Sequence, residues 1–261
     1  MRSSLIYLLI LFVALFSFEG CAVRPAEVGR PKPALPGEWL ARLDNRADYW
    51  QSYQANLHIK AESSKGKLSI RAVILARLPD RFRLEAFNLL GQTVALLVFN
   101  RDGSTLWIPS ERKVYTAARA EDLISHFLGV PLPLETFGYS LTACVPPHLI
   151  KNLELLQRGS EWQGASRSPL MDWAFLWTFL PDPFSMKAID VREGRRSYTV
   201  TFDPPTPLDL PNVPGKIIFL SSEWRMEVQL DQLLRSPDLG SPVFDSPSPT
   251  GIQKIDLDRA R

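Results

Sequence analysis

The stretch YQANLHIKAESSKGKLSIRAVILAR, residues 53–77, decides the fold of this chain. Apolar residues alternate with polar ones from Ala55 to Ala61. Leu68, Ile70, Ala72, Ile74 and Ala76 repeat this two-residue spacing, with Lys67, Ser69, Arg71 and Arg77 in the other phase. Successive side chains of a β-strand point to opposite faces, so each run predicts a strand with one apolar face. Small and polar residues at positions 63–66 are typical of a turn. The stretch therefore predicts an antiparallel hairpin.

The residues that follow extend this hairpin into a meander. We expect its further strands at residues 81–87, 92–100, 105–108 and 113–117. A short one-sided helix is expected at residues 120–128, because acidic residues begin it and Gly129 follows it. Its apolar face needs a partner, and the concave face of the preceding sheet is the nearest one.

The rest of the chain predicts one further helix and a second group of strands. Apolar residues at three-and-four spacing indicate a helix within residues 38–54. Strands are expected near residues 149–157, 173–180, 186–192, 197–202, 216–221 and 224–230. With 22 prolines against 14 glycines, the chain is predicted to be mainly β (α+β). We expect the folded domain at residues 38–234, followed at 235–261 by a mobile tail with a short terminal strand.

The N-terminus reads as an export signal. Residues 5–18 are almost wholly apolar after a basic start. A membrane-spanning helix needs about 20 apolar residues, whereas a secretory signal needs about 7–15, so residues 1–20 are predicted to be a signal peptide. Residues 21–37 hold four prolines without apolar periodicity, which indicates an extended tether.

Gly20-Cys21 resembles the lipobox of bacterial lipoproteins. That resemblance implies that Cys21 is acylated, with palmitate among its chains, and becomes the N-terminus. Ala22 stands where an aspartate would imply retention in the inner membrane, so the resemblance implies an outer-membrane lipoprotein whose domain faces the periplasm. The alternative is an ordinary signal peptide followed by an unmodified cysteine.

Composition and motifs give no support to catalysis. The formal net charge is +2 and no run of lysine and arginine is dense enough for nucleic acid. His58, His126 and His148 are isolated, and no phosphate loop, dinucleotide fingerprint or nucleophile motif is present. We therefore predict a protein that is not an enzyme, with no metal and no cofactor, and we expect Cys144 to be a buried apolar side chain.

Two apolar features remain unexplained by strand periodicity. Asn88-Leu89-Leu90-Gly91 occupies a turn, where polar residues are the rule. Burying two leucines yields roughly 3–6 kcal/mol, so Leu89 and Leu90 are expected to meet the domain's own core, a bilayer or a hydrophobic ligand. The other feature is one aromatic strand face: Trp173, Phe175, Trp177 and Phe179. It predicts either the wall of a ligand cavity or a strand that is buried on both faces.

The order of these elements matches a known pattern. An aromatic-rich helix, the strand ANLHIK at residues 55–60, the run PDRFRL at 79–84 and LGQT at 90–93 resemble the Lol-system family of outer-membrane lipoprotein receptors and periplasmic carriers. The resemblance covers roughly residues 39–133. It implies a curved, half-open antiparallel β-barrel, capped by short helices, that binds lipoprotein acyl chains in an apolar cavity.

The resemblance also implies roles for individual residues. Leu89 and Leu90 would contact the membrane during transfer, and a periplasmic carrier protein would be a partner. For the cavity that the resemblance implies, alternation along the strands and the capping helix predict the lining: Leu57, Ile59, Leu68, Ile70, Leu84, Val94, Leu96 and Phe127. The aromatic strand face has no counterpart in the family, and its residues are a further candidate for the lining: Trp173, Phe175, Trp177 and Phe179. We expect a lipoprotein that delivers lipoproteins or other lipids to the outer membrane. The alternative is a structural or assembly lipoprotein that has no open cavity and acts through protein partners.

Overall fold

The computed structural model describes residues 36–168, 173–181, 184–203, 213–236, 238–247 and 250–259. All of them belong to one compact unit, Leu35–Arg261. The predicted signal peptide, residues 21–35 of the predicted tether and the proline-rich loop at 204–212 lie outside the described residues.

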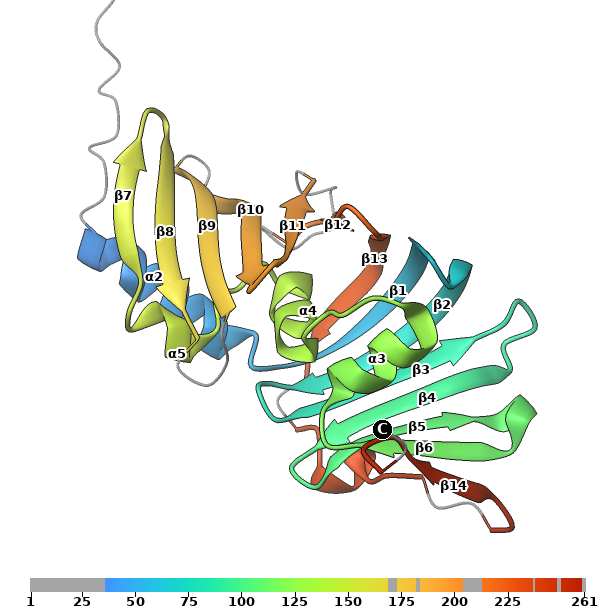
Figure 1. Cartoon of the computed structure of the whole chain (residues 1–261). Coiled ribbons are helices and arrows are strands. Elements are labelled where there is room, and N and C mark those ends of the chain that lie inside the picture. The colour runs from blue at the N-terminus through green and yellow to red at the C-terminus, as the bar shows by residue number, and fades with distance from the viewer. Residues whose placement is uncertain are drawn as a thin grey trace, which may run out of the picture. The chain divides into compact units, whose positions relative to one another are not determined.

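One open sheet of fourteen strands organises the described residues (Figure 1). Its strand order is β14-β6-β5-β4-β3-β2-β1-β13-β12-β11-β10-β9-β8-β7. The first half contains β1 (Ser52–Ser63), β2 (Gly66–Arg77), β3 (Arg81–Phe87), β4 (Thr93–Asn100), β5 (Gly103–Ile108) and β6 (Lys113–Ala117). The second half contains β7 (Glu154–Arg158), β8 (Glu161–Arg167), β9 (Trp173–Pro181), β10 (Phe184–Glu193), β11 (Arg196–Phe202), β12 (Lys216–Leu220) and β13 (Arg225–Arg235).

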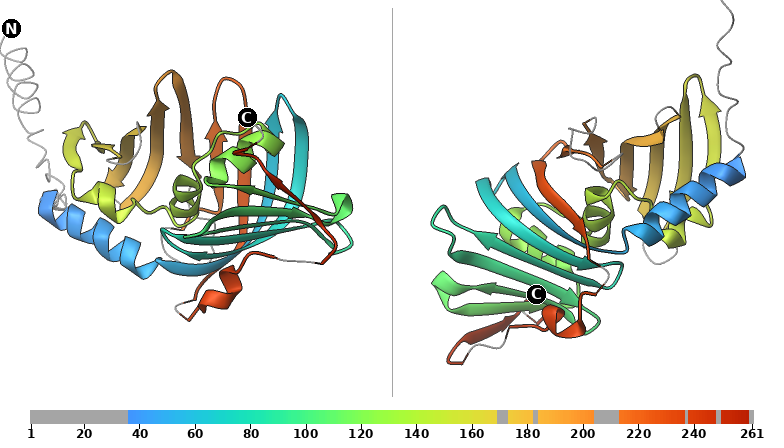
Figure 2. Two further views of the ribbon diagram at one scale, coloured as in Figure 1. Left: turned by 60° about the horizontal axis from the view of Figure 1, so that its bottom comes forward. Right: turned by 180° about the vertical axis from the view of Figure 1, so that it is seen from behind.

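The sheet curves around helices and does not close, which confirms the predicted half-open, mainly β fold (Figures 1 and 2). The α-helices of the described residues are α2 (Pro36–Tyr49), α3 (Ala120–Leu128), α4 (Leu134–Leu141) and α5 (Pro147–Ile150). A 3₁₀ turn, η1 (Pro109–Glu111), joins β5 to β6. Helices α3 and α4 cover the concave face of the sheet, while α2 lies across the strands of its second half (Figure 2).

The hairpin that decides the fold forms in the expected register. Leu57 lies opposite Ala72 and Ile59 opposite Ile70, so the apolar residues of both strands share one face. Gly66 has a φ of +119°, a conformation that glycine adopts without steric cost, and it closes the turn opposite Ser63. The alternation in the sequence thus fixes both the pairing and the face that turns inward.

Helix α4 is an element that sequence periodicity did not predict. All of its residues except Glu135 are buried, so it shows no amphipathic pattern. A Cβ at Gly138 would lie 2.8 Å from Leu78 Cδ2. The glycine therefore allows α4 to pack closely against Leu78 in the connection between β2 and β3.

The second half of the sheet has a core of aromatic side chains. The ring of Trp39 on α2 lies 5.4 Å from that of Trp162 and 6.0 Å from that of Phe179. Strand β8, which carries Trp162, was not predicted because its sequence is mostly polar. The strand expected near 149–157 is instead α5 followed by β7, because Pro147 occupies the first turn of a helix, where proline is favoured.

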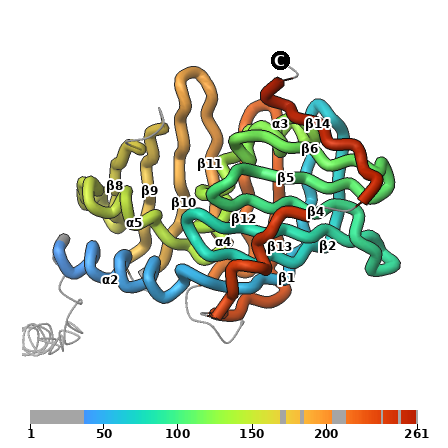
Figure 3. The backbone as a smooth tube through the Cα atoms, turned by 90° about the horizontal axis from the view of Figure 1, so that it is seen from below, coloured from blue at the N-terminus to red at the C-terminus, as the bar shows by residue number. Residues whose placement is uncertain are grey.

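The chain after β13 returns to the convex face of the first half (Figure 3). It forms a short 3₁₀ helix, η2 (Ser241–Phe244), and a last strand, β14 (Gln253–Asp256). Arg83 and Asn100 donate hydrogen bonds to the carbonyl oxygens of Val243 and Phe244, at 3.3 and 3.0 Å. Strand β14 pairs in parallel with β6, so the tail covers part of the convex face and extends one edge of the sheet.

Candidate functional site

A cavity of about 320 Å³ lies between α3 and the concave face of the first half of the sheet. Its lining consists of apolar side chains: Ile59, Leu68, Ile70, Leu84, Ala86, Val94, Ala95, Leu97, Leu106, Ile108, Leu123, Ile124, Phe127, Leu128, Leu132, Leu134, Phe137 and Met226. Strands β1 to β5 form the floor, and α3 forms the roof. Ligand pockets measure roughly 300–1,000 Å³, so this cavity is at the lower end of that range.

Many lining side chains remain partly exposed although they lie inside the fold. Ile70, Leu84, Val94 and Phe127 are half-buried, whereas Leu57, on the same face of β1 as Ile59, is 1% exposed. A side chain within a packed core is covered on all sides. These residues are covered on one side only, because they border an open apolar volume.

The structure brings half of the predicted lining together at this cavity: Ile59, Leu68, Ile70, Leu84, Val94 and Phe127. They come from β1, β2, β3, β4 and α3. Alternation along each strand and the one-sided pattern of α3 were the signals that identified them. The lining residues that sequence reasoning missed come mainly from β5, the rest of α3 and the unpredicted α4.

Leu57 and Leu96 are predicted lining residues that lie elsewhere. Leu57 is in the buried core and does not reach the cavity. The register of β3 with β4 shifts between Ala86 and Phe87, a β-bulge. A bulge changes the face to which the following side chains point, so Ala95 and Leu97 line the cavity and Leu96 does not.

The aromatic face of β9 does not border this cavity. Trp173, Phe175, Trp177 and Phe179 are buried in the second half of the sheet, where the rings of Phe175 and Trp177 stack at 5.6 Å. Trp177 Nε1 donates a 2.9 Å hydrogen bond to Ser166 Oγ. The aromatic face of β9 is thus packed within the protein's own core, whereas Leu176 on the other face is exposed.

The turn that joins β3 to β4 exposes its two leucines almost completely. Leu89 is 93% exposed and Leu90 is 83% exposed. Asn88 holds the turn, because its Oδ1 accepts hydrogen bonds from the backbone N–H groups of Leu90 at 2.9 Å and Gln92 at 3.0 Å. Gly91 completes it with a φ of +77°. We call residues 88–91 the leucine tip; it is a built turn that points both leucines away from the core.

Helix α3 is attached at its C-terminal end to the first hairpin. Ser63 Oγ donates a hydrogen bond to the carbonyl oxygen of Leu128. Phe127 also packs edge-on against Tyr115 on β6, with ring centroids 4.7 Å apart. The roof of the cavity is therefore held by one hydrogen bond to the β1–β2 turn and by apolar contacts with the sheet.

Titratable groups near the cavity are few and lie outside its lining. Glu135, at the start of α4, lies 3.4 Å from His148 Nδ1. Burial, followed by the charge of Glu121, raises the pKa of Glu135 to about 7, and burial lowers the pKa of His148. The described residues contain no group of three histidine, cysteine or acidic side chains able to hold a metal ion. No constellation for catalysis emerges from this geometry.

Comparisons with known proteins agree with this fold. The sequence model of the family "Outer membrane lipoprotein LolB" matches residues 51–163. Outer-membrane lipoprotein LolB of Shewanella amazonensis is 28% identical over 137 residues, which cover 49% of this chain and 56% of that protein. The chain thus spans little more than half the length of this curated relative. Over this segment the chain is LolB-like.

Solved structures support the same assignment at the level of the fold. A LolA-superfamily protein from Nitrosomonas europaea has a TM-score of 0.54 at 12% identity and covers 82% of this chain and 99% of that one. A DUF1329-family protein from Desulfovibrio piger reaches 0.60 at 10% identity, covering 80% and 95%. These findings confirm the predicted family, and the LolB relatives are named as lipoproteins, not as enzymes. No described helix has the length and hydropathy needed to cross a membrane.

Proposed function

We propose that this chain is a lipid-anchored lipoprotein of the outer membrane that accepts acyl chains in the α3 cavity and passes them to the bilayer. Residues 1–20 would be its signal peptide, Cys21 its acylated residue and residues 21–37 its tether. The domain would face the periplasm and receive cargo, lipoproteins or other lipids, from a periplasmic carrier protein. The names of its LolB relatives support this location.

The apolar cavity is the observation that carries the proposal. Its wall offers hydrocarbon on the strand side and on the helix side alike. Each methylene group transferred from water to such a wall contributes about 0.8 kcal/mol. A lipid tail needs no hydrogen-bond partner and can therefore bind in this cavity. A polar metabolite would lose its hydrogen bonds to water there and would find no replacement for them.

The size of the cavity favours onward transfer. At about 320 Å³ it can surround only part of a long acyl chain or of several chains together. A bilayer covers the whole of each chain, so more apolar area leaves water there than in the protein. Release would then proceed towards the bilayer without a covalent step, which is consistent with a protein that is not an enzyme.

The leucine tip supplies a means of contact with that bilayer. Leu89 and Leu90 are exposed on a turn held by internal hydrogen bonds, so both can enter an apolar phase without unfolding the domain. We propose that they do so during delivery. The alternative is a structural or assembly lipoprotein that works through protein partners, and the self-filled second half of the sheet is the feature that favours it.

Acyl binding separates these two proposals. The unit Leu35–Arg261 is titrated with a fluorescent fatty-acyl probe. Ile70→Glu places a charge in the cavity wall and should abolish probe binding, whereas Ser69→Glu places the same charge on the other face of β2 and should leave it unchanged. Circular dichroism is used to check that both variants are folded. Absence of probe binding by the parent protein would overturn the carrier proposal.

Delivery is measured separately from binding. Leu89→Glu together with Leu90→Glu should slow transfer of a bound probe to vesicles and leave its affinity for the protein unaltered. The change is expected to be tolerated by the fold, since both side chains are exposed. An unchanged rate of transfer to vesicles would show that the leucine tip takes no part in delivery.

A further inference from the structure

The leucine tip lies between two turns that carry positive charge. Because β1 to β6 run antiparallel in sequence order, the β1–β2, β3–β4 and β5–β6 turns lie at the same end of the sheet, with the leucine tip in the middle (Figure 1). Lys65 and Lys67 belong to the first turn and its edge, and Arg112 and Lys113 to the third. Neighbouring strands are about 4.8 Å apart, so each outer turn is roughly 10 Å from the tip.

Two of these four cations have no carboxylate partner among the described residues. Lys67 pairs with Glu62 at 2.9 Å, and Lys113 lies 3.8 Å from Glu111. Lys65 and Arg112 are exposed, and the ion pairs found in the described part of the chain include neither. A cation without a partner therefore stands on each side of the exposed leucines.

The cavity reaches the same end of the sheet. Leu68 follows the first turn, Val94 follows the tip and Ile108 precedes the third turn, and all three line the cavity. The C-terminus of α3 is attached there through Ser63. Tip, cations and cavity thus share one rim of the half-barrel.

We propose that this rim docks on a membrane surface through anionic phospholipid headgroups, with Lys65 and Arg112 binding phosphate while Leu89 and Leu90 enter the acyl region. The inference rests on the proposed delivery function and adds to it the kind of lipid that receives the cargo. Exposed apolar side chains flanked by lysine or arginine suit the interface between headgroups and acyl chains. Each basic residue near an anionic surface contributes about 1 kcal/mol.

A bilayer fits this rim better than a protein does. A stable protein interface buries about 800 Å² on each partner around a packed apolar centre. The rim instead presents two protruding leucines separated from charged turns, which suits insertion into a fluid surface. Glu223, exposed in the next turn beyond Lys65, limits the positive region on that side.

The test compares vesicles of phosphatidylcholine alone with vesicles that also contain phosphatidylglycerol. The unit Leu35–Arg261 should bind the anionic vesicles more tightly, and added salt should reduce the difference. Lys65→Gln with Arg112→Gln should weaken binding to the anionic vesicles about thirtyfold and leave binding to the neutral ones unchanged. Soluble glycerol phosphate at matched ionic strength should not compete.

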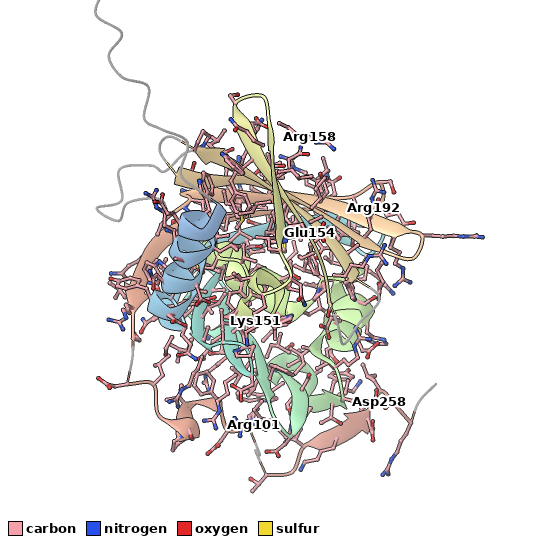
Figure 4. All side chains as sticks on the ribbon, turned by 90° about the vertical axis from the view of Figure 1, so that its left-hand side faces the viewer. Arg101, Lys151, Glu154, Arg158, Arg192 and Asp258 are labelled. Carbon is pink, nitrogen blue, oxygen red and sulfur yellow. The ribbon has the colours of Figure 1, made fainter. Side chains whose placement is uncertain are left out.

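Matched controls come from the second half of the sheet. Arg158, beside the β7–β8 turn, and Arg192, on β10, are exposed side chains of the second half of the sheet (Figure 4). Arg158→Gln with Arg192→Gln removes the same charge and should preserve the preference for anionic vesicles. Leu89→Ser with Leu90→Ser should lower binding to both kinds of vesicle.

The outcomes separate this inference from the function on which it rests. No preference for anionic vesicles, or an equal loss in the control, would overturn headgroup binding while acyl-probe binding still supported the carrier. Loss of binding to an acidic carrier protein, with vesicle binding intact in Lys65→Gln with Arg112→Gln, would assign the rim to a protein and also overturn the inference. Failure of the acyl-probe assay itself would refute the proposed function.

Discussion

Tyr53 on β1 donates a 2.7 Å hydrogen bond from its hydroxyl group to the carbonyl oxygen of Gly138 on α4. Tyr53 is fully buried, and Gly138 O is among the last four carbonyls of its helix, which lack intrahelical partners. Tyr53→Phe should therefore lower the free energy of unfolding by about 1–3 kcal/mol, because it leaves that carbonyl unsatisfied. Urea denaturation measures the change. Tyr115→Phe, which removes a bond to the exposed Glu111, should cost less.

Close packing at Gly138 gives a second prediction. Gly138→Ala should destabilise the protein by about 1–3 kcal/mol, because the added methyl group overlaps Leu78 Cδ2. Gly37→Ala on α2 is the matched control, since nothing lies within 4 Å of a Cβ there. Alanine is favoured over glycine in helices by about 1 kcal/mol, so this control should be neutral or stabilising. Equal effects at both positions would contradict the packing argument.

The attachment of α3 predicts a kinetic effect. Ser63→Ala removes the hydrogen bond to Leu128 O and should loosen the C-terminal end of the roof. We expect a bound acyl probe to dissociate several-fold faster, with overall stability reduced by about 1 kcal/mol. Stopped-flow dilution measures the rate. Ser69→Ala, on the exposed face of β2, should leave the rate unchanged, and an unchanged rate in Ser63→Ala would show that this bond does not hold the roof.

Glu135 predicts how stability depends on pH. Its pKa is raised to about 7 in the folded protein from an ordinary 4.5, so the folded state binds the proton more tightly. The contribution of protonated Glu135 to the free energy of unfolding is therefore fully present below about pH 4.5, and it is lost as the pH rises through about 7. Between pH 5 and 8 the wild type should lose about 2 kcal/mol relative to Glu135→Gln, which cannot ionise. His148 titrates in both proteins, so parallel stability curves would contradict the assignment.

The first half of the fold could be read from the sequence because its strands obey a simple rule. In β1, and in β2 from Leu68 to Ala72, one face is apolar and the other polar, and this pattern determines pairing and orientation together. Helix α3 was recognisable for the same reason: its apolar face repeats at helical spacing and Gly129 ends it. Ile59, Ile70 and Phe127, which the sequence pattern assigns to the apolar faces of these elements, line the cavity in the structure.

Elements that lack one apolar and one polar face were not predicted from the sequence. Helix α4 is buried at every position except Glu135, so it has no apolar face that stands out. Strand β8 is mostly polar, and its one large apolar side chain, Trp162, packs against Trp39 of a distant helix. The bulge near Phe87 changes which face of β4 points inward, and a shift of register between strands leaves no mark in local alternation. The aromatic face of β9 left open whether a ligand or the protein itself would cover it, because the covering element, α2, lies more than a hundred residues away in sequence.

The uniform lining of the α3 cavity limits what the protein could distinguish. Hydrogen-bonding groups distinguish one head group or peptide from another, but this wall is made of aliphatic and aromatic side chains. Such a wall responds to the length, branching and bulk of a hydrocarbon tail. In the proposed role the protein would therefore serve any client bearing the common acyl modification, and the selection of clients would take place at an earlier step of export.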